Sequence, residues 1–274
     1  MSMPAAHKAS HFRALHAGPG ALLMPNAWDA GSARMLAGLG YQSIATSSGA
    51  AAGVLGRRDG RLTRAEALAH CKGIVAAVDV PVSADLENGF GPSPEDAALT
   101  VRMAIDAGLA GGSIEDATGD AGQPLYERAH AVQRVAAAVA AARAGPAPFV
   151  LTARAENFLR GNPDLDDTIA RLQAFEMAGA YVLFAPGLPD LDAVRQVCAA
   201  LSKPFSFMVG IRGKSFSVAQ LEAAGVRRIS LATSLYRVAM AALHEAAREV
   251  KEQGTFGYLE RTVTTPDLSK YMQG

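Results

Sequence analysis

Eight short apolar runs, each followed by a turn and a longer stretch with helical spacing, limit the folds open to this chain more than any other feature. The expected strands cover residues 21–25, 43–46, 81–85, 111–115, 148–154, 180–185, 204–209 and 227–232. The expected helices cover 29–39, 63–78, 93–108, 124–143, 166–178, 190–201, 217–224 and 233–252. Short buried strands that alternate with helices are typical of parallel βαβ units. Eight units in about 250 residues predict a (β/α)8 barrel of the TIM type.

A doubly wound open sheet is the alternative fold. Such sheets carry a G-x-G-x-x-G phosphate-binding turn after the first strand, whereas the corresponding stretch here reads MPNAWDAGS. Glycines that follow four of the expected helices support the helix boundaries, because a left-handed C-terminal cap favours glycine. These glycines are Gly40, Gly108, Gly179 and Gly225.

The charge balance excludes several classes of partner. Lys plus Arg equals Asp plus Glu, at 26 each among 274 residues, so neither nucleic acid nor an anionic membrane is an expected partner. The basic pairs at 57–58 and 227–228 are isolated, and we expect each to make local contacts. No apolar run has the length of a signal-peptide core or a membrane span.

The two cysteines indicate the redox environment of the protein. Cys71 and Cys198 lie far apart in apolar helical contexts, so we expect two small buried side chains in a reducing cytoplasm rather than a disulfide.

No shift in composition divides the chain into separate domains. We therefore expect one barrel domain over 1–254, with a short N-terminal segment, and a C-terminal extension over 255–274. The extension is expected to contain a short helix and to pack on the barrel or on a neighbouring subunit.

Acidic residues mark the ends of two neighbouring strands. Asp85 and Glu87 close the third run in VSADLENGFG, and Glu115 closes the fourth in GGSIED. Active sites of TIM barrels lie at the carboxyl ends of the strands, so we expect these side chains in one mouth. Carboxylates held so close repel one another, and a hard divalent cation is the simplest neutraliser. Oxygen ligands without His or Cys favour Mg²⁺, or Mn²⁺, over Zn²⁺.

Other residues at the strand ends suit an anion. Arg154 ends the fifth run, where a guanidinium can clamp a carboxylate or phosphonate through two parallel hydrogen bonds; a structural ion pair with a neighbouring acid is the alternative. Thr46, Ser47 and Ser48 offer hydroxyl and backbone N–H groups in a glycine-containing turn. A metal, an arginine and this turn together suit a small 2-oxo acid as ligand.

On these motifs the chain resembles the isocitrate lyase / phosphoenolpyruvate mutase superfamily over nearly its whole length. The matching stretches are SSGAAAGVLGRRD, VSADLENGFG, GGSIED and TARAENF, in this order. The resemblance implies a barrel whose last helix is exchanged between paired subunits, within a tetramer built as a dimer of helix-swapped dimers. It also implies Mg²⁺ held by Asp85 and, largely through water, by Asp59, Glu87 and Glu115.

The resemblance further implies which residues bind the substrate. Thr46, Ser47 and Ser48 match the family's site for the substrate carboxylate, and Arg154 matches the residue that binds the substrate's anionic end. Asp59 has a role beside the metal on this reading, with a local salt bridge to the adjacent arginines as the alternative. Family members cleave or form C–C or P–C bonds next to a 2-oxo acid or its enolate.

The stretch after the fourth strand departs from the family's pattern. Lyases of the family carry a K-[KR]-C-G-H loop whose Cys is the acid–base group, whereas this chain reads EDATGDAGQPLYE, without Cys, Lys or His. This argues against a Cys-dependent isocitrate or methylisocitrate lyase. The Asn and Lys of the mutase loop are not found either. Decarboxylases of the family have a His near the end of the seventh strand, where Lys214 is the nearest titratable group.

Three functions follow from these observations. The first is a magnesium-dependent carbon–carbon lyase that acts on a small 2-oxo or 2-hydroxy dicarboxylate through a metal-stabilised enolate, with oxaloacetate decarboxylation as an example. The second is a P–C bond enzyme of the phosphonomutase or phosphonopyruvate hydrolase type. The third, from another class, is a protein that binds a 2-oxo acid without turnover.

Overall fold

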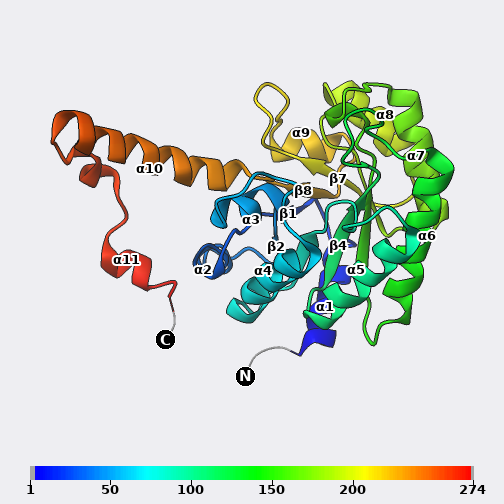
Figure 1. Cartoon of the computed structure of the whole chain (residues 1–274), viewed down its shortest axis with the longest axis horizontal. Coiled ribbons are helices and arrows are strands. Elements are labelled where there is room, and N and C mark those ends of the chain that lie inside the picture. The colour runs from blue at the N-terminus through cyan, green and yellow to red at the C-terminus, as the bar shows by residue number, and fades with distance from the viewer. Residues whose placement is uncertain (1–3, 273–274) are drawn as a thin grey trace.

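The strands of this protein form a nearly closed parallel barrel. The computed structural model describes residues 4–272 (Figure 1). The strands are β1 (Leu22–Met24), β2 (Ile44–Ala45), β3 (Val82–Asp85), β4 (Gly111–Glu115), β5 (Val150–Arg154), β6 (Val182–Phe184), β7 (Phe205–Met208) and β8 (Arg228–Ser230). Their order is β1-β8-β7-β6-β5-β4-β3-β2, and a parallel bridge between Asn26 and Ala45 joins β1 to β2. The predicted (β/α)8 barrel is confirmed, and the doubly wound alternative is wrong.

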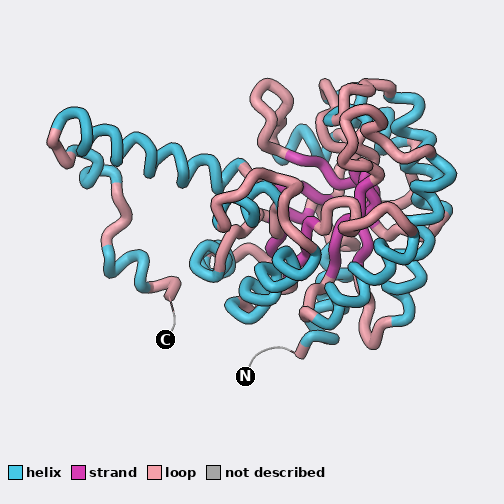
Figure 2. Tube along the Cα trace, viewed as in Figure 1, coloured by secondary structure: helices cyan, strands magenta, loops and turns pink. Residues whose placement is uncertain are grey.

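Within the described range, seven helices cover the outside of the barrel where the sequence predicted them (Figure 2). They are α2 (Ala30–Gly38), α4 (Arg64–Ala77), α5 (Pro94–Asp106), α6 (Arg128–Ala144), α7 (Leu165–Met177), α8 (Leu191–Ala199) and α9 (Val218–Ala223). The glycines predicted to cap helices have positive φ, between 84° at Gly108 and 103° at Gly179. The sequence did not predict α1 (Ala5–Leu15), α3 (Ser48–Val54) or the short 3-10 helix η1 (Asn157–Leu159).

Alternate residues of each strand point into the barrel or out to the helices. On β5, Leu151 and Ala153 belong to the main core between sheet and helices, whereas Val150 packs inside the barrel. Helix α1 closes the amino end of the barrel, since Phe12 is fully buried there in a cluster with Leu22 and Val150. The carboxyl end of the barrel therefore stays open as the place for a site.

The last long helix differs from the others. Helix α10 (Ser234–Gln253) forms where the sequence predicted it, but none of its residues is buried, and it projects away from the barrel (Figure 1). The short η2 (Gly257–Arg261) and α11 (Thr265–Ser269) follow it, and the short helix predicted for the extension is thus present. The chain then returns to the barrel, where the Tyr271 ring lies over Gly38 of α2. Within residues 4–272, no helix combines the length and apolarity needed to cross a membrane.

Candidate active site at the barrel mouth

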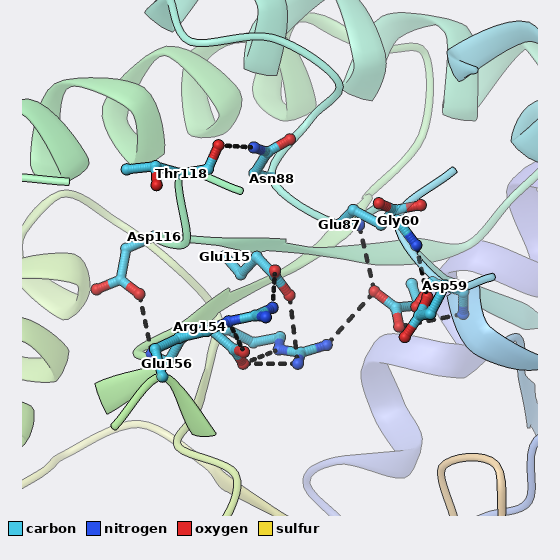
Figure 3. Close-up of polar contacts among 12 residues, drawn as sticks. Asp59, Gly60, Glu87, Asn88, Glu115, Asp116, Thr118, Arg154 and Glu156 are labelled. Carbon is cyan, nitrogen blue, oxygen red and sulfur yellow. Dashed lines mark hydrogen bonds and ion pairs between the residues drawn. The ribbon is translucent and has the colours of Figure 1, made fainter. Parts of the chain in front are cut away.

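Three neighbouring strands each end in a charged residue of the predicted site. Asp85 ends β3, Glu115 ends β4 and Arg154 ends β5. The parallel register places Glu115 directly beside Arg154, and Asp85 beside Ser113 two residues before Glu115. The side chains therefore enter the same mouth from adjacent strands, as the sequence predicted. Figure 3 shows Glu115 and Arg154 pointing toward each other there.

Arg154 lies among three carboxylates. Its Nη1 is 3.4 Å from Asp85 Oδ1, and its Nη2 is 3.3 Å from Glu115 Oε2 and 2.6 Å from Glu156 Oε1. Its Nε also donates to Glu156 Oε1 at 3.0 Å. The structural ion pair weighed as an alternative for Arg154 is thus present. Whether the guanidinium also binds substrate remains a prediction.

A second arginine and a buried salt bridge hold this cluster in place. Arg160, just after η1, contacts Glu115 Oε1 at 3.1 Å and Glu156 Oε2 at 3.2 Å. The Glu156 backbone N–H donates to Asp116 Oδ1 at 2.9 Å, and Asp116 Oδ2 is paired with Arg171 at 3.1 Å. The sequence did not reveal a role for Arg160, because a residue in the loop after β5 carries no strand-end signal.

Crowding makes the carboxylates hard to ionise. Burial, then the negative charge of Glu156, raises the pKa of Glu115 to about 8 against the opposing effect of Arg154. Burial, followed by the charges of Asp85 and Asp59, raises the pKa of Glu87 to about 7. The site thus holds more negative charge than its two arginines relieve, and a further cation there would lower the electrostatic cost.

Asp59 and Glu87 approach Asp85 from two loops. Glu87 adopts a left-handed backbone conformation, with φ of 50°, and its N–H donates to Asp85 Oδ1 at 3.2 Å. Asp59 accepts a hydrogen bond from Gly60 N–H at 3.0 Å. The salt bridge weighed for Asp59 is not seen in the described part of the chain, where Arg57 pairs with Glu66 at 2.7 Å.

These oxygen donors suit a hard cation such as Mg²⁺ in type and in charge. Their arrangement does not amount to a finished ligand set, since no group of three or more His, Cys, Asp or Glu side chains within residues 4–272 is placed to hold a metal ion. The resemblance implies a Mg²⁺ that keeps several of its waters and takes few direct protein ligands. The ligand roles of Asp85, Asp59, Glu87 and Glu115 therefore remain predictions.

The stretch predicted as a glycine-containing turn is instead the start of a helix. Ser47 caps α3, with its hydroxyl accepting from Ala50 N–H, and Thr46 Oγ1 accepts from Asp85 N–H at 3.1 Å. The Ser48 N–H donates to Asp85 Oδ2 at 3.3 Å. A serine just before a run of small residues is the signal in the sequence that could have indicated this cap.

The mouth leads into a cavity of about 300 Å³ inside the barrel. Asp59, Asp85, Arg154 and residues 46–48 line it, so the structure brings most of the predicted site residues around one space. Arg228, on β8, lines the same cavity. The sequence predicted only a local contact for Arg228 and did not place it in the site. The signal available in the sequence was a charged residue within a buried strand, two positions before Ser230, so that both side chains face the same way.

The loop after β4 is bonded to itself. A bridge joins Ala117 to Leu125, Thr118 N–H donates to the Pro124 carbonyl at 3.0 Å, and Tyr126 N–H donates to the Asp116 carbonyl at 2.9 Å. Internal hydrogen bonds of this kind fix a loop over the rim of the mouth without bringing a Cys, Lys or His to it.

The two cysteines are poorly suited to acid–base chemistry, and Lys214 contacts a backbone carbonyl. Lys214 Nζ donates to the Gly187 carbonyl at 3.4 Å, and no ion pair joins it to an acidic side chain of the described residues. Cys71 is buried and Cys198 is partly buried, each as a free thiol. Burial raises the pKa of both thiols to about 12, so neither is a ready nucleophile near neutral pH.

Comparison with known proteins places this geometry in a family. The family model described as phosphoenolpyruvate phosphomutase matches residues 12–251. The 2-methylisocitrate lyase of Escherichia coli is 31% identical over 226 residues, which is 79% of this chain and 75% of that protein. The oxaloacetate decarboxylase of Paraburkholderia xenovorans is 31% identical over 236 residues, or 83% and 77%.

A solved structure gives a similar result. A Burkholderia cenocepacia J2315 protein, provisionally assigned as a lyase/mutase, is 48% identical and superposes with a TM-score of 0.95 over 97% of this chain and 96% of that one. The similarity therefore extends over the barrel and most of the C-terminal region.

Proposed function

The chain belongs to the phosphoenolpyruvate phosphomutase family, and we propose that it is a magnesium-dependent carbon–carbon lyase for a small 2-oxo or 2-hydroxy dicarboxylate. The observation that carries the proposal is the meeting of Asp85, Glu115 and Arg154 beside a cavity of about 300 Å³. Carboxylates with raised pKa values favour a cation, and the arginines favour an anionic ligand. A bound cation would compensate the charge of the carboxylates, and a small carboxylate ligand would compensate the charge of the arginines.

Each residue has a role in this proposal. Asp85 holds the cation directly, and Asp59, Glu87 and Glu115 orient its waters. Arg154 exchanges its contact with Asp85, the longest of its ion pairs at 3.4 Å, for a carboxylate of the substrate. Residues 46–48 bind the carboxylate next to the 2-oxo group. When bound, the cation would supply Lewis-acid chemistry at the 2-oxo oxygen.

The short loop after β4 favours a reaction that needs no acid–base side chain from it. In the decarboxylation of oxaloacetate, the C3–C4 bond breaks, CO₂ leaves, and the electron pair remains in the enolate of pyruvate. Water can then supply the proton at C3. The proposal therefore takes an oxaloacetate decarboxylase-like reaction as its first example, in line with the relative from Paraburkholderia xenovorans.

A P–C bond enzyme is the second candidate, because the matching family model is that of phosphoenolpyruvate phosphomutase. A substrate panel with Mg²⁺ distinguishes the two reactions. Pyruvate from oxaloacetate, or cleavage of a larger dicarboxylate, supports the lyase; phosphate from phosphonopyruvate supports the second candidate. Binding of 2-oxo acids in calorimetry without turnover of any substrate would instead support the non-catalytic binding protein.

The C-terminal region supports a proposal about assembly. We propose that α10 packs on a neighbouring subunit, in a dimer of helix-swapped dimers, and that the extension over 255–274 packs on the barrel or on that subunit. Along α10, Leu235, Ala239, Leu243 and Val250 fall on one helical face, and Leu243 is 60% exposed. An apolar stripe of this kind is ordinarily covered in a folded assembly. Sedimentation of the purified protein at several concentrations tests this assembly.

A further inference from the structure

Arg228 forms the floor of the cavity in the barrel. It begins β8, and its Nη1 donates to Thr152 Oγ1 on β5 at 2.9 Å. Because Thr152 lies two residues before Arg154 on the same strand, both face inward, and Arg228 lies below Arg154. The residue is 4% exposed, and it lines the cavity that Asp85 and Arg154 also line.

The two arginines of the cavity differ in their neighbours. Arg154 has three carboxylates within ion-pair distance, whereas no described residue forms an ion pair with Arg228, and its Nε has no hydrogen-bond partner there. Burial and the nearby charge of Arg154 lower the pKa of Arg228 to about 9. Its other titratable neighbour is His16, whose pKa is lowered to about 4 by burial and by the charge of Arg228, so that it is neutral at pH 7.

A buried guanidinium without a counter-charge is costly, and proteins ordinarily pair it. The cavity is the side from which a counter-charge can reach Arg228. Ser83, Ser113 and Ser230 line that cavity with small polar side chains, which can donate hydrogen bonds to an anion. A carboxylate placed there would lie between two guanidinium groups, from Arg228 and Arg154.

We propose that Arg228 binds a carboxylate of the ligand at the floor of the cavity, so that the site selects small dicarboxylates over monocarboxylates. The groups at the mouth hold the ligand's other carboxylate. The identity of the substrate rests on the proposed function, but the anion site at the floor depends only on the geometry of Arg228. A planar guanidinium binds a carboxylate through two parallel hydrogen bonds, a geometry that a lysine cannot reproduce.

The test uses unreactive ligands and the metal-free protein. Thermal unfolding is followed in EDTA with rising concentrations of malonate, a dicarboxylate, and of acetate, a monocarboxylate. We expect malonate to stabilise the wild type with an apparent dissociation constant at least tenfold lower than that of acetate. In Arg228→Met this preference should disappear, whereas Arg227→Met, its exposed neighbour, should keep it.

Two further variants and outcomes complete the test. Arg228→Met should fold, because exchange of an unpaired buried charge for an apolar side chain is often neutral or stabilising; if it does not, Arg228→Lys keeps the charge and should bind malonate more weakly than the wild type. An undiminished malonate preference in both variants, or none in the wild type, would overturn the proposal.

If the proposed lyase function is wrong, the experiments give a different result from the one expected if the floor site is wrong. A protein that binds malonate through Arg228 but turns over no 2-oxo or 2-hydroxy dicarboxylate with Mg²⁺ would keep the floor site and lose the lyase proposal. Conversely, magnesium-dependent turnover by Arg228→Met with an unchanged ratio of dicarboxylate to monocarboxylate binding would keep the lyase and remove the floor site.

Discussion

The barrel mouth and the C-terminal arm, residues 234–272, are incomplete in opposite ways. In the mouth, Arg154 and Arg160 contact Glu115 and Glu156, yet burial still raises the pKa of Glu115 to about 8. In the arm, α10 is a regular helix of 20 residues without a buried residue. The shorter α6 buries seven of its 17 residues against the barrel. The carboxylates of the mouth lack positive charge, and most of α10 lacks apolar contact.

The difference teaches what each region needs from outside the chain. Charge crowded in a water-poor place is compensated by an ion or a charged ligand, which supports the proposal that the mouth is a binding site. Exposed apolar residues along a helix are covered by another apolar surface, which supports the proposal that the arm is an interface. Four predictions test this contrast, from the largest expected effect to the smallest.

The strongest test of the mouth is the loss of Asp85. We expect Asp85→Ala to lower magnesium-dependent turnover and Mg²⁺ affinity by about a hundredfold or more, because changes even in residues that support a metal's ligands cost about 10- to 100-fold. Calorimetry and a coupled assay measure the two quantities. Asp192→Ala, on the exposed side of α8, is the matched control and should leave both unchanged. Unchanged Mg²⁺ affinity in Asp85→Ala would remove the proposed cation site.

The strongest test of the arm is a charge on its apolar face. We expect Leu243→Asp to weaken self-association by at least about tenfold, since burial of a leucine contributes about 1.5–3 kcal/mol. Sedimentation velocity over a range of concentrations measures the shift. His244→Asp places the same charge one residue along, on the polar face, and should associate like the wild type. Equal association of both variants would show that this face is not the interface.

The pKa values in the mouth predict how the stability of metal-free protein varies with pH. The folded-state pKa values of Glu87 and Glu115 are raised from 4.5 to about 7 and about 8. Their contribution to stability is therefore present below pH 4.5 and is lost as the pH rises through 7 and 8. In EDTA, we expect the melting temperature to fall between pH 5 and pH 9, and Mg²⁺ to restore more of it at pH 9, where the carboxylates are ionised.

Glu115→Gln isolates the larger of these effects. It should reduce the fall by about 2–4 °C, which corresponds to about 1 kcal/mol in a protein of this size. Glu95→Gln, at the exposed start of α5, is the control and should not change the fall. A pH dependence identical in the wild type and Glu115→Gln would mean that Glu115 ionises without penalty.

The smallest effect is expected for the cysteines, because they belong neither to the acidic cluster of the mouth nor to the exposed apolar face of α10. We expect Cys71→Ser and Cys198→Ser to keep turnover within about twofold, although the buried hydroxyl of the first can cost about 1 kcal/mol of stability. Steady-state assays and thermal unfolding measure this. Complete loss of turnover in a folded Cys→Ser variant would assign the missing acid–base group to that thiol.

Much of the barrel was predictable because its signals are local. Each strand is a short apolar run, and glycines such as Gly108 and Gly179 occupy left-handed caps that follow from the sequence alone. The rule that TIM-barrel sites lie at strand ends also predicted that Asp85, Glu115 and Arg154 share one mouth. The start of α3 at Ser48 was missed, because a short glycine- and alanine-rich run is also compatible with a turn.

The sequence by itself determined the strand–helix order, and with it the place of the acids at the carboxyl ends of β3 and β4, since periodicity and turn chemistry act over a few residues. Tertiary structure alone decided three things: that Arg154 is shared among three carboxylates, that Arg228 reaches Thr152 across the barrel, and that α10 leaves the barrel. Each depends on which distant segments come together when the barrel closes. Contacts between residues far apart in the chain leave no periodic trace in the sequence.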